Sequence, residues 1–100
     1  MTQPAPVDIL LATYNGARYL APQLDSLLAQ THSHFRLLVS DDGSSDDTLT
    51  ILRRYEAAFG GRMLLLPTDV RSGGVARNFE RLMRASAEHG QARWMAFCDQ

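Results

Sequence analysis

The chain has 100 residues, of which 45% are hydrophobic and 21% charged, which is the composition of an ordinary globular domain able to bury a core. Ten Lys and Arg residues against eleven Asp and Glu residues give a net charge of -1, so no basic surplus argues for a nucleic-acid partner. The single cysteine, Cys98, excludes an internal disulfide and a cysteine zinc cluster.

The first strand and helix follow from the amino-terminal part of the sequence. Residues 8–12 form a short apolar run that ends before Asn15-Gly16, which is typical of a buried strand. Pro22 is best tolerated in the first turn of a helix, so the next helix is expected to begin near Leu20 or Ala21. Leucines at helical spacing mark its buried face: Leu20, Leu24, Leu27 and Leu28.

The same alternation continues to the end of the chain. Strands are predicted over residues 35–40, 63–66 and 94–98, the last with Cys98 as a small buried hydrophobe. A second helix is expected after a cap at Ser45 or Asp46 and ends at Gly60-Gly61. A third helix ends at Gly90, and one face of it carries Val75, Phe79, Leu82 and Met83. The pattern predicts an α/β fold, a parallel Rossmann-like sheet of about four strands with three helices packed on both faces.

No repeat, low-complexity stretch or linker divides residues 1–100, so they are expected to form a single segment of one domain. The last strand ends at Asp99-Gln100 without a following helix, which indicates truncation. No signal peptide is visible, and the longest apolar runs are far shorter than the ~20 residues that cross a bilayer. A cytoplasmic location is therefore expected, with attachment to the inner face of a membrane left to sequence beyond Gln100.

Polar and acidic residues follow each predicted strand. In open parallel sheets, ligands bind at the carboxyl ends of the strands. These residues should therefore share one rim of the sheet: Thr13-Tyr14-Asn15-Gly16, Asp41-Asp42-Gly43-Ser44, Thr68-Asp69 and Asp99-Gln100.

Four residues suit the chemistry of a nucleotide. Tyr14 offers an aromatic face to a planar base, and ionised Asp42 accepts the imide N–H that uracil and thymine have and adenine lacks. Asp99 is suited to ribose hydroxyls or a divalent cation. Arg77, on the third helix, is suited to a phosphate or carboxylate.

Each of these residues also has a simpler interpretation. Asp41-Asp42-Gly43-Ser44 fits a turn and helix cap, Tyr14 a half-buried packing aromatic, and Arg77 a solvated partner of Glu80. Asp99 beside Gln100 fits a plain strand end. The histidines show no metal-site spacing, and the other arginines of the helices and loops are interpreted as surface charges: Arg18, Arg53, Arg54, Arg71, Arg81 and Arg84.

Several other functions lack their motif. No G-x-G-x-x-G, G-x-x-x-x-G-K-[ST] or G-x-S-x-G occurs, which weighs against dinucleotide, P-loop and α/β-hydrolase sites. A nucleotidyltransferase would need a glycine-rich basic loop where residues 13–18 stand, and they match it poorly. A receiver-like signalling domain would need a late lysine, and the chain contains no lysine.

Five segments follow one another in the order of a known family's motifs: residues 9–16, 23–31, 39–48, 74–79 and 97–100. They cover almost the whole chain, and together they resemble the family 2 glycosyltransferases, inverting enzymes with the GT-A fold. That family often has proline where Ala12 stands. The segments 41–46 and 98–100 resemble its rhamnosyltransferase-like members, which act on bacterial surface polysaccharides.

The resemblance implies a role for each matching residue. Ala12, Thr13 and Tyr14 would lie against the base and ribose, and Asp42 would read the base imide. Arg77 would approach the base or the diphosphate. Asp99 looks like the first acid of the family's D-x-D motif, which binds the ribose and the Mg²⁺ or Mn²⁺ ion on the diphosphate.

The resemblance also implies the partners. The donor would be a UDP- or dTDP-sugar, and the acceptor a saccharide or a lipid-linked saccharide. The catalytic base and the last acid of the metal motif would follow Gln100, so the segment by itself is expected to be inactive.

Overall fold

The computed structural model describes residues 7–29, 35–67, 71–89 and 94–98. Strands and helices alternate, as predicted. They are β1 (Val7–Thr13), α1 (Ala17–Leu28), β2 (Phe35–Asp41), α2 (Thr48–Phe59), β3 (Met63–Leu65), α3 (Val75–His89) and β4 (Trp94–Cys98). The predicted Gly90 end of α3 and the residues Thr68-Asp69 and Asp99-Gln100 lie outside the described ranges.

The four strands form one parallel sheet in the order β3-β2-β1-β4. After β3 the chain crosses over β1 to place β4 on the far side, so the strand order changes direction at β1. The register pairs Thr13 with Asp41, which brings the carboxyl ends of β1 and β2 level with each other. A ligand site is expected at this end of a sheet with such a switch in direction.

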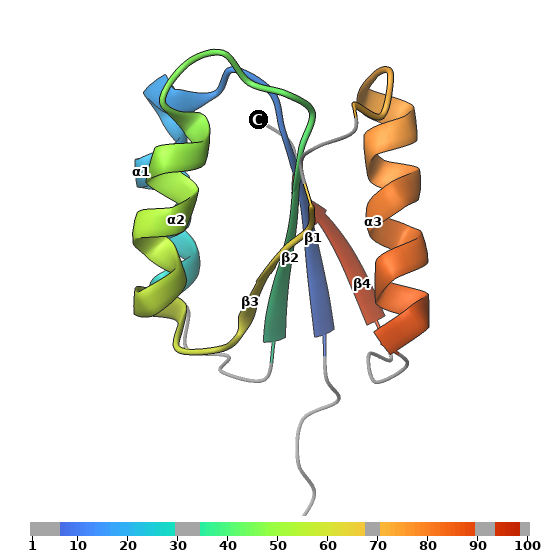
Figure 1. The fold of residues 1–100 in the computed structure, drawn as a ribbon. Helices are drawn as coiled ribbons and strands as arrows, with labels where there is room; N and C mark the ends of the chain where they lie inside the picture. The colour runs from blue at the N-terminus through green and yellow to red at the C-terminus, as the bar shows by residue number, and fades with distance from the viewer. Residues whose placement is uncertain (1–6, 30–34, 68–70, 90–93, 99–100) are drawn as a thin grey trace, which may run out of the picture.

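Helices α1 and α2 cover one face of the sheet and α3 covers the other (Figure 1). Successive side chains of a strand point to opposite faces, so Ile9 and Leu11 enter the core under α1 and α2 while Leu10 and Ala12 enter the core under α3. Burial on both faces explains why β1 and β2 have continuous apolar runs rather than alternation.

Helix α1 begins at Ala17, and the predicted start near Leu20 or Ala21 was wrong. The start of α2 holds this earlier turn in place. The Gly16 N–H donates to Thr48 Oγ1 at 3.0 Å, and the Ala17 N–H donates to Asp46 Oδ2 at 3.2 Å. Pro22 therefore lies inside the helix, with an exposed side chain.

The buried face of α3 also differs from the prediction. Leu82 is buried and Phe79 packs against the core, as predicted, but Val75 is 64% exposed and Met83 is 38% exposed, and Ala85 is buried in their place. Two polar residues complete the face that packs on the sheet. Asn78 Nδ2 donates to the Ser40 carbonyl at 2.8 Å, and the Ser86 hydroxyl donates to Asp8, so the periodicity of apolar residues alone misplaces this face. None of the helices within the described ranges is both long and apolar enough to cross a lipid bilayer.

Candidate functional site

A pocket with a volume of about 460 Å³ opens where β1 and β2 end, against the loop that precedes α3. It brings together four of the residues predicted from the sequence, Ala12, Thr13, Tyr14 and Asp42. The complete lining among the described residues adds the loop and the first turn of α3: Arg71, Gly73, Gly74, Val75 and Asn78.

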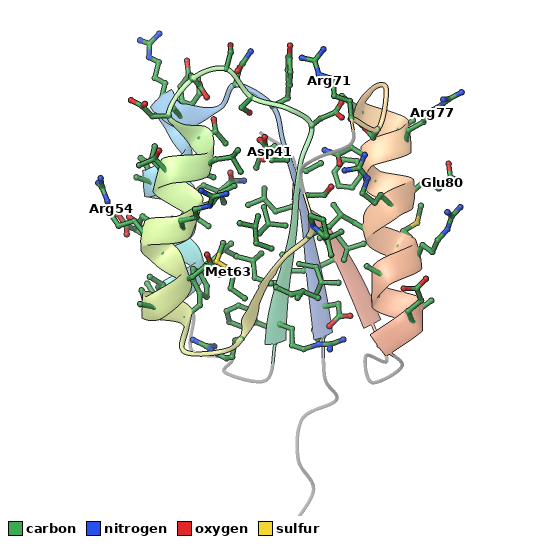
Figure 2. The ribbon with its side chains drawn as sticks, in the orientation of Figure 1. Asp41, Arg54, Met63, Arg71, Arg77 and Glu80 are labelled. Carbon is green, nitrogen blue, oxygen red and sulfur yellow. The ribbon has the colours of Figure 1, made fainter. Side chains whose placement is uncertain are left out.

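The two adjacent aspartates at the end of β2 have separate partners. Asp41 is fully buried, and its carboxylate accepts the Thr13 hydroxyl at 2.7 Å, the Ser44 N–H at 2.9 Å and the Ser44 hydroxyl at 2.6 Å. Figure 2 shows Asp41 at the upper end of the sheet, on the side toward α2. The turn interpretation of this motif therefore applies to Asp41, while Asp42 lines the pocket.

The Asp42 carboxylate also anchors the loop before α3. Its two oxygens accept the Ser72 N–H and, at 3.2 Å, the Gly74 N–H. Burial opposes ionisation of Asp42, but hydrogen bonds from Ser72, Gly74 and Gly73 outweigh it and lower its pKa below the ordinary 3.8. Asp42 is therefore an ionised, acceptor-only group at neutral pH, and a carboxylate with about four lone-pair sites has capacity left for a ligand N–H.

The residues that follow β1 are arranged by a connection between two loops. Tyr14 is 54% exposed, so part of its ring is accessible to a ligand. Asn15 has a positive φ of 48°, its N–H donates to Ser44 Oγ at 2.7 Å, and its Oδ1 accepts the Ser45 N–H at 2.8 Å. This connection holds the Tyr14 backbone beside the β2–α2 loop. The sequence placed Asn15 at the rim of the sheet but gave it no role, although asparagine before glycine is a known signal for the left-handed conformation.

The hydroxyl of Thr13 does not face a ligand, because it donates to the buried Asp41 carboxylate. Thr13 is 1% exposed, and its carbonyl accepts the Asp42 N–H at 2.9 Å. Its contribution to the pocket is therefore to fix the two strand ends against each other.

Arg77 lies outside this pocket, in a neighbouring hollow of about 470 Å³. In Figure 2, Arg77 and Glu80 both point from α3 away from the sheet. Glu80 forms an ion pair with Arg84, at 3.4 Å, rather than with Arg77. The described lining of the hollow is Arg71, Ser72, Arg77, Glu80, Arg81 and Arg84.

Arg71 lines both the pocket and the hollow. The sequence interpretation of Arg71 as a surface charge missed this position, because nothing local to Arg71 reveals that its loop returns to the end of β2. The Ser72-Gly73-Gly74 turn was the only signal, and it indicates a change of direction without a destination.

The predicted metal ligand Asp99 lies outside the described residues. Within the described part of the chain, no group of three His, Cys, Asp or Glu side chains is placed to hold a metal ion. The prediction of a Mg²⁺ or Mn²⁺ site therefore stays a prediction.

The pocket combines an exposed aromatic ring, an ionised acceptor and a neighbouring guanidinium. An aromatic ring stacks on the face of a planar base, and a carboxylate accepts an N–H from its edge. This arrangement is suited to binding a nucleobase.

Known proteins with similar sequences are glycosyltransferases. The sequence profile described as "Glycosyl transferase family 2" matches residues 8–100. The dTDP-rhamnosyl transferase RfbG of Shigella flexneri is 34% identical over 74 residues, which are 74% of this chain and 26% of the relative. The putative teichuronic acid biosynthesis glycosyltransferase TuaG of Bacillus subtilis is 33% identical over 94 residues, 93% of this chain and 34% of the relative.

Solved structures of glycosyltransferases have the same arrangement of elements. Staphylococcus aureus TarS 1-349 in complex with UDP-GlcNAc superposes with a TM-score of 0.74 and 26% identity, covering 94% of this chain and 26% of TarS 1-349. The mannosyltransferase PcManGT of Pyrobaculum calidifontis, in complex with GDP-Man and Mn²⁺, has a TM-score of 0.71 and 25% identity, covering 84% and 25%. The α/β fold predicted from the sequence is confirmed.

The chain spans about a quarter to a third of the length of the curated relatives RfbG and TuaG. The profile match, in contrast, covers the chain from the second residue of β1 to its last residue. Because this match covers residues 8–100, the chain belongs to glycosyl transferase family 2.

Proposed function

We propose that this chain is the donor-nucleotide-binding part of an enzyme that transfers a sugar, with inversion, from a UDP- or dTDP-sugar to a saccharide or lipid-linked acceptor. The observation that carries the proposal is the pocket in which ionised Asp42 lies with exposed Tyr14 at the carboxyl ends of β1 and β2. Membership of the family favours this function over a nucleotidyltransferase or a receiver-like domain.

The proposed roles follow from the chemistry of each group. Tyr14 stacks on the base, an interaction that contributes ~1–3 kcal/mol per base, and Asp42 accepts the imide N–H. Ala12 and Thr13 form the floor under the base and ribose. Arg77, in the hollow beside the pocket, is assigned to the phosphate end of the donor.

A divalent cation is proposed as the cofactor, with Asp99 among its ligands. A bound Mg²⁺ or Mn²⁺ ion would neutralise the diphosphate that leaves with the nucleotide. The similarity to PcManGT, solved with GDP-Man and Mn²⁺, supports this assignment. The residues described here serve to bind and orient the nucleotide, and none is proposed as the catalytic base.

The relatives support the donor and the pathway. RfbG is named a dTDP-rhamnosyl transferase, TuaG is named for teichuronic acid biosynthesis, and TarS was solved with UDP and with UDP-GlcNAc. We propose synthesis of a bacterial surface polysaccharide, on the cytoplasmic side and at the inner face of the membrane.

Calorimetric titration of the chain with UDP, dTDP and ADP tests the proposal. UDP and dTDP are expected to bind, and Asp42→Ala should weaken both about 10- to 100-fold, because a hydrogen bond to a charged acceptor contributes about 1.5–3 kcal/mol. Asp47→Ala is the matched control, since Asp47 is exposed and makes no side-chain cap hydrogen bond. Repeating the titration with Mn²⁺ tests the cofactor.

Two outcomes would contradict the proposed base site, and a third would contradict the proposed cation site. Equal affinity for ADP and UDP would rule out reading of the imide by Asp42. An Asp42→Ala variant that binds UDP with the affinity of the wild type would show that Asp42 does not bind the base. A UDP affinity unchanged by Mn²⁺ would argue against a cation site in this chain, without affecting the base pocket.

A further inference from the structure

The loop of residues 71–74 packs directly on the turn that follows β2. Ser72 and Gly74 donate their N–H groups to the two oxygens of Asp42, and Arg71 Nη2 approaches the Gly43 carbonyl at 3.4 Å. Gly73 and Gly74 have φ values of 94° and 134°, which few other residues adopt. The loop therefore has a defined position, and its first residue is held over Gly43.

The Arg71 side chain occupies the space where a side chain at position 43 would lie. A Cβ atom built on Gly43 would be 2.7 Å from Arg71 Nε and 3.2 Å from Arg71 Cγ, both closer than normal contacts. Gly43 also has a φ of 82°, in the region that favours glycine. The absence of a side chain at position 43 thus allows Arg71 to lie against the end of β2.

This packing places a donor and an acceptor in the lining of the same pocket. Among the described residues that line the pocket, Arg71 is the only cation and Asp42 is the only carboxylate. They belong to the two segments that the Ser72–Asp42 hydrogen bond joins. Arg71 is exposed, so its N–H groups are accessible to a bound molecule.

An acceptor beside a donor matches the imide edge of a pyrimidine. Uracil and thymine present a central N–H between two carbonyl groups, whereas cytosine has an acceptor nitrogen in place of the N–H and an amino group in place of one carbonyl. A guanidinium carries N–H donors only. It attracts the carbonyl and repels the amino group.

We propose that Arg71 is a specificity-determining residue of this pocket. Its guanidinium donates to the base carbonyl that cytosine replaces with an amino group, while Asp42 accepts the neighbouring imide N–H. Asp42 and Gly43 also act as positioning residues, because they hold the loop that carries Arg71. This inference rests on the proposed binding of UDP or dTDP in the pocket.

The test compares UDP with CDP by calorimetric titration of the wild-type chain and of Arg71→Gln. The variant should bind UDP and dTDP about tenfold more weakly and CDP no more weakly, so the preference for UDP over CDP falls about tenfold. Arg54→Gln is the matched control, because Arg54 points outward from α2 in Figure 2 and is expected to leave both affinities unchanged.

Gly43→Ala provides a second, independent variant. Its Cβ should displace the Arg71 side chain, so it should weaken UDP binding in the wild-type background and have little further effect in Arg71→Gln. The positive φ makes this substitution destabilising as well, and the binding cycle separates the two effects because it compares affinities of folded protein.

The outcomes separate this inference from the proposed function. A wild-type chain that binds UDP, with an unchanged preference for UDP over CDP in Arg71→Gln, would overturn the role of Arg71 and leave the proposed function standing. Additive losses from Gly43→Ala and Arg71→Gln would overturn the positioning role of Gly43. A wild-type chain that binds neither UDP nor dTDP would overturn both the inference and the proposed function.

Discussion

Asp41 and Asp42 are adjacent aspartates with different roles. Asp41 is the last residue of β2, is fully buried, and accepts hydrogen bonds from Thr13 and Ser44. Asp42 comes immediately after it and lines the pocket. Because successive side chains at a strand end point to opposite sides, one carboxylate builds the turn and the other remains available to a ligand.

The lowered pKa of Asp42 predicts how base binding depends on pH. Because the pKa of Asp42 in the folded chain lies below 3.8, its carboxylate stays ionised and able to accept the imide N–H until the pH falls below that value. The affinity for uridine, which has no phosphate to titrate, should be constant from about pH 8 to about pH 5 and fall only below about pH 4. NMR titrations at several pH values measure it.

A loss of uridine affinity between about pH 7 and about pH 5 would contradict this prediction, because it would identify a group that titrates like histidine. Asp47→Ala serves as the control, since loss of this exposed acid should leave the pH profile unchanged.

Part of the site could be predicted from sequence because it follows directly from the strands. Ala12, Thr13, Tyr14 and Asp42 stand at the ends of two apolar runs, and the rule for parallel sheets brings such ends together. The position of Arg71 in the pocket and the hydrogen-bond partners of Asn15 could not be predicted in the same way. They depend on contacts between loops about 30 residues apart, which no local pattern encodes.

At the scale of the elements, each strand and helix of the described residues was predicted from sequence, but the start of α1 was misplaced, and the N-cap of α2 is Asp47 rather than Ser45 or Asp46. The start of α1 depends on Asp46 and Thr48, which supply hydrogen-bond acceptors to Ala17 and Gly16 from the beginning of α2. The hydrogen bonds from Thr48 and Ala17 also lower the pKa of Asp46, so the ionised carboxylate is the form that holds this turn. The predicted start near Leu20 or Ala21 was based on the position of Pro22 in the sequence, which contains no information on these tertiary contacts.

The interior position of Pro22 predicts that Pro22→Ala stabilises the chain. Proline lacks the N–H that would bond to the Arg18 carbonyl, and its side chain is exposed, so nothing buried is lost. The free energy of unfolding should rise by about 1–2 kcal/mol, less than the ~3 kcal/mol difference in helix propensity because alanine also frees the unfolded chain. Urea denaturation measures the change.

Ser26→Ala is the matched control on the same helix, since Ser26 is exposed and retains its N–H. It should change the free energy of unfolding by about 0.5 kcal/mol or less. A Pro22→Ala variant less stable than the wild type would show that the proline ring makes a stabilising contact and would contradict the prediction.

At the scale of the whole molecule, the sheet separates two cores of different character. The core under α1 and α2 contains large aliphatic and aromatic side chains, including Phe35 and Phe59, whose rings pack edge to face at 6.4 Å. Among the described residues, the core under α3 contains aliphatic side chains and Phe79, and α3 is also attached by polar contacts, from Asn78 to the Ser40 carbonyl and from Ser86 to Asp8. Directional contacts of this kind fix the position of α3, and with it the loop that closes the pocket.

One of these attachments is part of a polar cluster formed by Asp8, Arg36 and Ser86. Arg36 donates to both Asp8 oxygens, at 2.9 Å and 2.8 Å, and Ser86 adds a third hydrogen bond from α3. Asp8 is fully buried, whereas the Arg36 side chain is 29% exposed and keeps some access to water. The cluster joins β1, β2 and α3 at the end of the sheet opposite the pocket.

Removal of either Asp8 or Ser86 should therefore reduce stability, and the two effects should not add. Ser86→Ala should lower the free energy of unfolding by about 1 kcal/mol, and Asp8→Ala by about 3 kcal/mol, because removing the carboxylate leaves the guanidinium without its partner. Once Asp8 is absent, Ser86→Ala should cost little more, which gives a coupling energy of about 1 kcal/mol in a double-mutant cycle followed by urea denaturation. Strictly additive losses would mean that the hydroxyl stabilises α3 without Asp8, and the cluster would not be the attachment of α3 to the sheet.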